Sequence, residues 1–263
     1  MQNLKHCVNA NWLFNNGLLF LMKNTVEEAR INLAAAYRLA DMHGLSEGIC
    51  NHLTLVVPGY SDRFLIIAYG THWSQARASD LLIVDISGNI IEGKGVVEDT
   101  ALYIHGRIHA LRPDLSCIMH THQSYTLAIA MTEKGRLLPA SQNAMRFQGR
   151  IAYDDDYNGL ALAEIEGDRI VAAMENKNIL FMANHGVLVG GVSVASTYDD
   201  LYYLERAATT QVLAESRNKT LKLIPEDLAT MTSQQILSNN NYALDHFKAL
   251  KKILDKTQPD YKE

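Results

Sequence analysis

The chain has 263 residues, of which 48% are hydrophobic and 20% are charged, a composition typical of a globular protein with a large core. Its formal net charge of −5 and its lack of long basic runs argue against a nucleic-acid partner. The three cysteines, Cys7, Cys50 and Cys117, are too few and too scattered for a disulfide framework. We therefore expect a cytoplasmic protein.

The beginning of the chain contains an apolar run from Trp12 to Met22 that two asparagines and a glycine interrupt. A transmembrane helix needs about 20 apolar residues, so we expect no membrane association. The run also lacks the small-residue cleavage site that is typical of a signal peptide. Residues 1–24 are interpreted as an N-terminal extension of uncertain status, with translation from Met22 as the alternative.

Helix and strand signals alternate in the first half of the chain. Thr25, with Glu28 three residues later, is typical of a capping box and predicts an amphipathic helix over residues 25–43. Short strands are predicted next, at residues 53–57, 64–67, 81–84 and 90–91. A helix predicted over residues 100–111 then places three side chains on one face, namely Ala101, His105 and His109.

The second half is less regular. Residues 138–156 are predicted to be rich in loops, and a helix over 167–175 and strands over 179–182 and 187–189 follow. A long helix is predicted from Ser193 to Arg217, which ends the main domain at about residue 220. Residues 221–263 are predicted to form a helical tail, with one amphipathic helix at 242–254, and we expect this tail to be peripheral. The predicted main domain is therefore 25–220.

Three histidines follow hydrophobic strands. Alternate side chains of a strand point to the same face, so His120 and His122 can reach one point. His185 follows another hydrophobic strand and precedes a glycine. Three imidazoles at strand ends are typical of a catalytic zinc site with an open coordination position. The alternative is that they are ordinary polar residues where strands enter loops.

The order of these motifs resembles the class II aldolase/adducin family, over residues 25–217. The matching motifs are Gly44-Leu45-Ser46-Glu47-Gly48, Asn51-His52, Arg112-Pro113-Asp114, His120-Thr121-His122 and Asn184-His185-Gly186. The resemblance implies an α/β fold, a single three-layer α/β/α domain around a largely antiparallel central sheet. It also implies homotetramers with active sites between subunits. Finally, it implies a divalent metal on His120, His122 and His185, zinc first, with iron or manganese as alternatives.

The resemblance also implies a chemistry, in which the metal acts as a Lewis acid and stabilises an enolate formed by carbon–carbon cleavage. It places Ala101 where the aldolases carry their acid/base glutamate, and alanine cannot transfer protons. Four replacements are considered: His105 first, then His109, Glu98, and a loop tyrosine, Tyr153 or Tyr157, that acts as an acid across a subunit interface. His105 is alternatively a fourth metal ligand, and each of these residues has a purely structural alternative.

The phosphate pocket implied by the resemblance is altered. Asn51 and Thr54 remain as predicted substrate-binding residues, but Cys50 replaces a glycine and Asp99-Thr100 replaces a serine pair. A carboxylate at Asp99 would repel a phosphate. We therefore expect an unphosphorylated carboxylic or aromatic acid as substrate, with Thr100 as a further contact. Arg146 or Arg150 is a candidate for holding its carboxylate, unless both form surface ion pairs.

Three functions remain open. The leading hypothesis is a metal-dependent carbon–carbon lyase, an aldehyde-lyase or carboxy-lyase, that acts on a small hydroxy or oxo compound and is not a sugar-phosphate aldolase. The second is a non-catalytic, adducin-like interaction module, which the alanine at position 101 favours and the intact histidines disfavour. The third is a non-haem iron oxygenase on the same scaffold.

Overall fold

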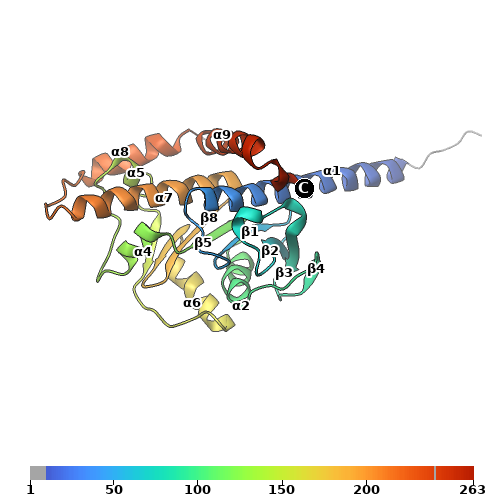
Figure 1. Ribbon diagram of the computed structural model, residues 1–263, viewed down its shortest axis with the longest axis horizontal. Helices are drawn as coiled ribbons and strands as arrows, with labels where there is room; N and C mark the ends of the chain where they lie inside the picture. The colour runs from blue at the N-terminus through green and yellow to red at the C-terminus, as the bar shows by residue number, and fades with distance from the viewer. Residues whose placement is uncertain (1–9, 240) are drawn as a thin grey trace, which may run out of the picture.

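The computed structural model describes residues 10–239 and 241–263, with side chains from residue 25 onward (Figure 1). Cys7 and the first nine residues of the predicted extension lie outside the described residues. The fold is organised around one eight-stranded sheet, in the order β4-β3-β2-β1-β5-β8-β7-β6. The strands are β1 (His52–Val56), β2 (Arg63–Ile67), β3 (Leu81–Asp85), β4 (Ile90–Glu92), β5 (Cys117–Thr121), β6 (Ile151–Asp154), β7 (Ile179–Met182) and β8 (Gly186–Gly191).

Helices cover both faces of this sheet (Figure 1). One layer holds α1 (Ala10–Met42) and α7 (Val194–Glu215), with α8 (Glu226–Leu237) and α9 (Tyr242–Thr257) farther out. The other layer holds α6 (Glu164–Met174) and a helical segment made of α2 (Asp99–Ala101), the π-helical turn η3 (Leu102–Gly106) and α3 (Arg107–Leu111). The short helices are α4 (Ser124–Ala130), α5 (Gln142–Met145), η1 (Trp73–Gln75), η2 (Ala78–Asp80) and η4 (Pro259–Lys262).

The alternation of side chains along the central strands produces these layers. Met119 of β5 packs in the cluster under α1 and α7, whereas its neighbour Ile118 packs in the cluster under α3 and α6. Every strand pair is antiparallel except β6 with β7, which are parallel. The predicted three-layer α/β/α fold with a largely antiparallel sheet is therefore confirmed.

Several predicted elements have different limits. The first helix begins at Ala10, so the capping-box interpretation of Thr25 was wrong: this residue lies inside α1, because a Thr and a Glu three residues apart also fit a helix interior. The predicted loop-rich stretch 138–156 contains α5 and β6. The short helix α4 and the amphipathic helix α8 were not predicted.

The C-terminal tail packs into the main core. Phe247, Leu250, Leu254 and Tyr261 belong to the same hydrophobic cluster as the inner faces of α1 and α7. The expectation of a peripheral tail was therefore wrong. Polar residues that suggested it lie on the outer face of α9, whereas Phe247, Leu250 and Leu254 of this helix face the core. In the described part of the chain, no helix is long and apolar enough to cross a membrane.

Candidate metal centre

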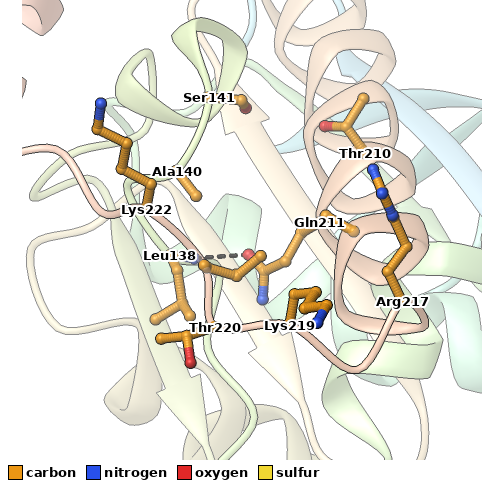
Figure 2. Close-up of a pocket in the computed structure, with 11 residues that line it drawn as sticks. Leu138, Ala140, Ser141, Thr210, Gln211, Arg217, Lys219, Thr220 and Lys222 are labelled. Carbon is orange, nitrogen blue, oxygen red and sulfur yellow. Dashed lines mark hydrogen bonds between the residues drawn. The ribbon is translucent and has the colours of Figure 1, made fainter.

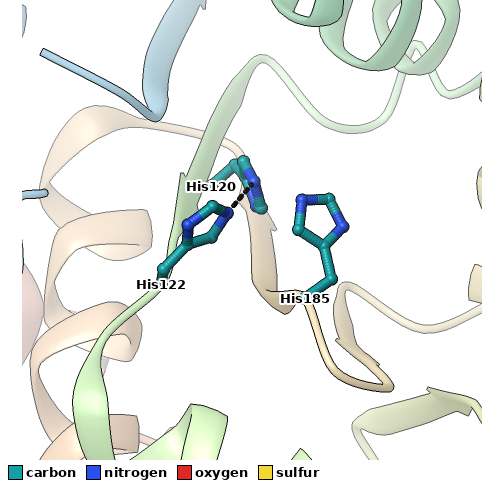
Figure 3. A group of neighbouring side chains, drawn as sticks. All are labelled: His120, His122 and His185. Atoms are coloured by element: carbon teal, nitrogen blue, oxygen red, sulfur yellow. Dashed lines mark hydrogen bonds between the residues drawn. The ribbon is translucent and has the colours of Figure 1, made fainter. Parts of the chain in front are cut away.

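Three histidine side chains converge at one end of the sheet. His120 lies in β5, His122 follows that strand directly, and His185 lies in the tight turn between β7 and β8. Because β5 pairs with β8, with Thr121 opposite Val187, the end of one strand meets the start of the other. The ring centroids are 4.8 to 5.0 Å apart, and one nitrogen of each ring lies within 4.8 Å of the others (Figure 3). We call these residues the histidine trio.

The hydrogen bonds of the trio leave its inner nitrogens free to accept a cation. Nδ1 of His120 lies 3.0 Å from the carbonyl oxygen of Val187, and Nδ1 of His122 lies 2.5 Å from Oε2 of Glu47. A carbonyl or carboxylate only accepts, so each Nδ1 carries the proton and each Nε2 presents a lone pair. These two Nε2 atoms face each other at 3.2 Å, as Figure 3 shows. A cation held by His120 and His122 would replace the repulsion between these lone pairs by attraction, so the donor set fits a divalent metal.

Burial favours the neutral form of His120 and His185, which is the form that binds a metal. His120 is buried, and desolvation lowers its pKa well below the ordinary value. Desolvation also lowers the pKa of His185 to about 4, and the neighbouring His122 acts in the same direction. His122 and His185 are half-buried, so the centre is reachable from solvent.

Backbone geometry positions two members of the trio. Asn51 and Asn184 adopt left-handed conformations, with φ of 71° and 57°, which asparagine tolerates better than most residues. The side chain of Asn51 accepts a hydrogen bond from the main-chain N–H of His122 at 3.2 Å. Gly186 is required for another reason, because a Cβ there would lie 2.5 Å from the carbonyl oxygen of Thr121 and 2.8 Å from the ring of His122.

His105 and His109 lie behind the centre in the core. Both rings contact Oγ1 of Thr54 at 2.8 Å, and all three side chains are buried. Burial lowers the pKa of His105 well below its ordinary value and that of His109 to about 4. Thr54 therefore connects β1 to the helical segment 99–111 through both histidines.

Glu98 lies beside the trio, immediately before α2. Its Oε2 is 2.6 Å from Nε2 of His52, and Thr100 donates a hydrogen bond to its Oε1 at 3.1 Å. The His52 ring in turn stacks against the ring of His120, with centroids 6.5 Å apart and planes at 24°. The hydrogen bond to His52 lowers the pKa of Glu98, and His122 contributes in the same direction.

His52 and Glu47 were missed as functional candidates, although both lie in motifs that carry the family resemblance. A signal for His52 was present, because it lies two residues before Thr54 and so faces the same side of the strand. Its register opposite His120 depends on the pairing of β1 with β5, which the sequence does not specify.

Tyr153 was predicted on a loop but lies in β6. Its hydroxyl accepts a hydrogen bond from the main-chain N–H of Leu137 at 3.1 Å, its ring packs against Phe181, and Arg136 lies over the ring. These contacts do not bring it to the trio of its own chain. Tyr157, the alternative tyrosine, lines a small cavity beside His185.

Arg146 and Arg150 form ion pairs with α7. Arg146 is buried and pairs with Asp199 at 2.8 Å, and Arg150 pairs with Asp200. Both guanidinium groups are neutralised within the fold. The ion-pair alternative therefore accounts for the two arginines, although the pairs are largely buried and not at the surface.

The family described as "Class II Aldolase and Adducin N-terminal domain" matches residues 31–212. The chain belongs to this family. The match contains the whole histidine trio, Glu47, His52 and Glu98.

Members of the class II aldolase/adducin family are also similar over most of the chain. A protein of Caulobacter vibrioides, provisionally named aldolase class 2, is 36% identical over 80% of this chain and 81% of its own length. The crystal structure of an aldolase II superfamily protein from Pseudomonas syringae is 36% identical, with a TM-score of 0.85 over 91% of this chain and 96% of that one. Alpha-adducin of Rattus norvegicus is 35% identical over 70% of this chain, which corresponds to 25% of that longer protein.

The position that the family resemblance assigns to the aldolase glutamate is apolar in this class II aldolase/adducin protein. Ala101 is fully buried and belongs to a small cluster with Phe64 and Ile66. A charged side chain at this depth would need a partner that the cluster does not offer. Acid/base chemistry at position 101 is therefore absent.

A larger cavity of about 480 Å³ lies elsewhere in the fold, at the C-terminal end of α7 (Figure 2). Gln211 crosses it and accepts a hydrogen bond from the main-chain N–H of Leu138 at 2.7 Å. The basic side chains of Arg217, Lys219 and Lys222 line its rim, and no member of the trio does. These cations therefore belong to a cavity separate from the histidine trio.

Proposed function

We propose that this class II aldolase/adducin protein is a divalent-metal-dependent carbon–carbon lyase for a small hydroxy-oxo compound. The observation that carries the proposal is the pair of Nε2 atoms of His120 and His122, 3.2 Å apart, with both Nδ1 atoms occupied by acceptors. His185 completes the donor set. Zinc suits three imidazoles and an open position best, and iron and manganese are the alternatives.

A divalent cation on the trio supplies Lewis-acid polarisation of a substrate carbonyl. The protein contributes the orientation of the ligands. Glu47 and the carbonyl of Val187 fix the tautomers and ring positions of His122 and His120. Asn51 holds the main chain of His122, so we assign this predicted substrate-binding residue a supporting role.

Glu98 is the best replacement for the missing glutamate. It is half-exposed, its pKa is lowered by the hydrogen bond to His52, and it therefore holds a proton-accepting charge at neutral pH. Thr100 and His52 fix its position. His105, His109 and Tyr153 are weaker candidates than Glu98. The two histidines contact Thr54 in the core, and the hydroxyl of Tyr153 is bonded to the main chain of Leu137.

The homotetramer implied by the resemblance is part of the proposal. Large apolar side chains are exposed around the cavity beside His185, which supports a contact between copies at the rim of the centre. These side chains are Tyr157, Leu160, Leu162 and Ile165.

The adducin-like module is the second candidate, because Ala101 removes one catalytic group of the aldolases. Metal analysis of the full chain, purified without chelator, separates the two. The lyase predicts about one zinc, iron or manganese per chain and loss of this metal in His120→Ala and His185→Ala. The half-exposed His72, which lies in no metal cluster of the described residues, provides the control His72→Ala.

A chain that remains metal-free after reloading with zinc, iron and manganese would support the interaction module. Iron together with oxygen consumption would support the oxygenase. For a metal-bearing chain, a screen of 2-oxo acids, 3-hydroxy acids and hydroxyketones identifies the substrate. In that screen we expect Glu98→Gln to retain the metal but lose turnover.

A further inference from the structure

Carboxylates surround the histidine trio. Glu47 is bonded to His122, and Glu98 interacts electrostatically with the same ring. The charge of Glu166 acts on His185, with which it lines the same small cavity. Three carboxylates therefore interact with members of the trio.

The cavity beside His185 adds to this charge. Asp154, Asp156 and Glu166 line it, and within the described residues Arg169 is its only lysine or arginine. Arg169 is already committed, because it pairs with Asp154 at 2.7 Å and with Glu166 at 2.7 Å. No uncommitted cation of this cavity is left to meet an anionic group of a substrate.

Arg146 and Arg150, the two candidates for holding a substrate carboxylate, lie elsewhere, and so does Arg217. Arg146 and Arg150 are neutralised by aspartates of α7. Arg217 lines the separate cavity at the end of that helix. The five carboxylates thus exceed the combined positive charge of Arg169 and a divalent cation at the trio, and this excess disfavours anions at the loaded centre.

We propose, on the basis of the function proposed above, that the centre selects an uncharged substrate, a hydroxyketone or hydroxyaldehyde without phosphate or carboxylate groups. This replaces the carboxylic acid expected from the sequence and favours retro-aldol cleavage over decarboxylation, whose substrate must carry a carboxylate. In the cleavage, the hydroxyl proton passes to a base and the carbon–carbon bond breaks as the new aldehyde carbonyl forms. The electron pair left on the α-carbon then takes up a proton, so no oxidant or co-reactant is needed.

A matched pair of metal-chelating probes tests the selection. Glycolohydroxamate and its phosphate ester differ only in the phosphate, and their binding to the cobalt-loaded full chain is measured from the visible spectrum. At low salt, we expect the uncharged probe to bind at least about tenfold more tightly than the phosphate ester. This difference in affinity, which we call the gap, should narrow as salt screens the carboxylates. Asp156→Asn should narrow the gap about threefold, because its exposed carboxylate faces the cavity.

Glu226→Gln is the matched control, since it removes one exposed charge on α8 and should leave the gap unchanged. Equal or tighter binding of the phosphate ester would overturn the selection while leaving the metal-dependent lyase intact. A gap unaffected by Asp156→Asn and by salt would also overturn it. Failure of the chain to bind cobalt at all would overturn the proposed function and the selection together.

Discussion

Gly186 lies at the start of β8, where the backbone passes next to the end of β5 and to His122. Its backbone passes so close to Thr121 and His122 that an added methyl group would meet the Thr121 carbonyl at 2.5 Å. A main-chain atom cannot move aside as a flexible side chain can. The separation of β5 and β8 at their ends, and with it the distance from His185 to the other two rings, therefore depends on this glycine.

We accordingly expect Gly186→Ala to lower zinc affinity about tenfold or more, because it pushes His122 away from His185. Competition with a chromophoric chelator measures the affinity, and circular dichroism monitors the fold. Gly190→Ala in the same strand is the control, since its added methyl meets the side chains of Leu115 and Ile118, which can adjust. Equal zinc affinity for both variants would contradict this role of Gly186.

At the scale of one element, the helical segment 99–111 is fastened to β1 by uncharged histidines. His109 is buried next to Thr54 and packs against Phe64. Its pKa in the folded state is about 4, against an ordinary value of 6.5. Protonation therefore favours the unfolded chain, and the stability that the neutral ring contributes is complete above pH 6.5 and lost as the pH falls to 4.

The free energy of unfolding should rise by about 3 kcal/mol between pH 4 and pH 7 on account of His109, from about 1.4 kcal/mol per unit of pKa shift. Urea titrations across this range measure the slope. In His109→Gln the slope should fall, whereas His72→Gln on the surface should leave it unchanged. A wild-type stability that is flat or decreases over this range would refute the neutral-histidine interpretation.

The sequence was informative where the two-residue repeat of side chains along a strand determines which residues share a face. His120 and His122 share a strand face because the side-chain period is two, and their convergence follows from local spacing alone. Glu47, His52 and Glu98 meet the trio through strand pairing and chain reversal, which no local pattern encodes. The strand β6 was interpreted as loop for a different reason. Only alternate side chains of this short strand are buried, and the aspartates at its end are typical of turns.

At the scale of the whole molecule, the C-terminal tail is part of one cooperative core. Leu254 is fully buried in α9, inside the cluster shared with α1 and α7. An ion pair also joins the tail to α1, because Arg38 lies 2.7 Å from Asp260. The sequence hid this role because the same stretch is rich in lysine and asparagine on its exposed side.

Leu254→Ala should lower the free energy of unfolding by about 2–5 kcal/mol, the usual cost of a cavity in a packed core. Leu244→Ala in the same helix removes the same atoms from a side chain that is 43% exposed, and should cost less than about 1 kcal/mol. Chemical denaturation followed by fluorescence compares the two. Similar small losses would mean that α9 unfolds separately from the sheet.

The π-helical turn at residues 102–106 contains more chain than an α-helical turn of the same length along the axis. Shortening it by one residue would let the segment close into regular α-helix. The flanking α-helical turns would keep their phase, because a π-turn only accommodates the additional residue. The backbone within the turn would tighten, so we expect His105 to lose its present position beside Thr54 while His109 keeps its own.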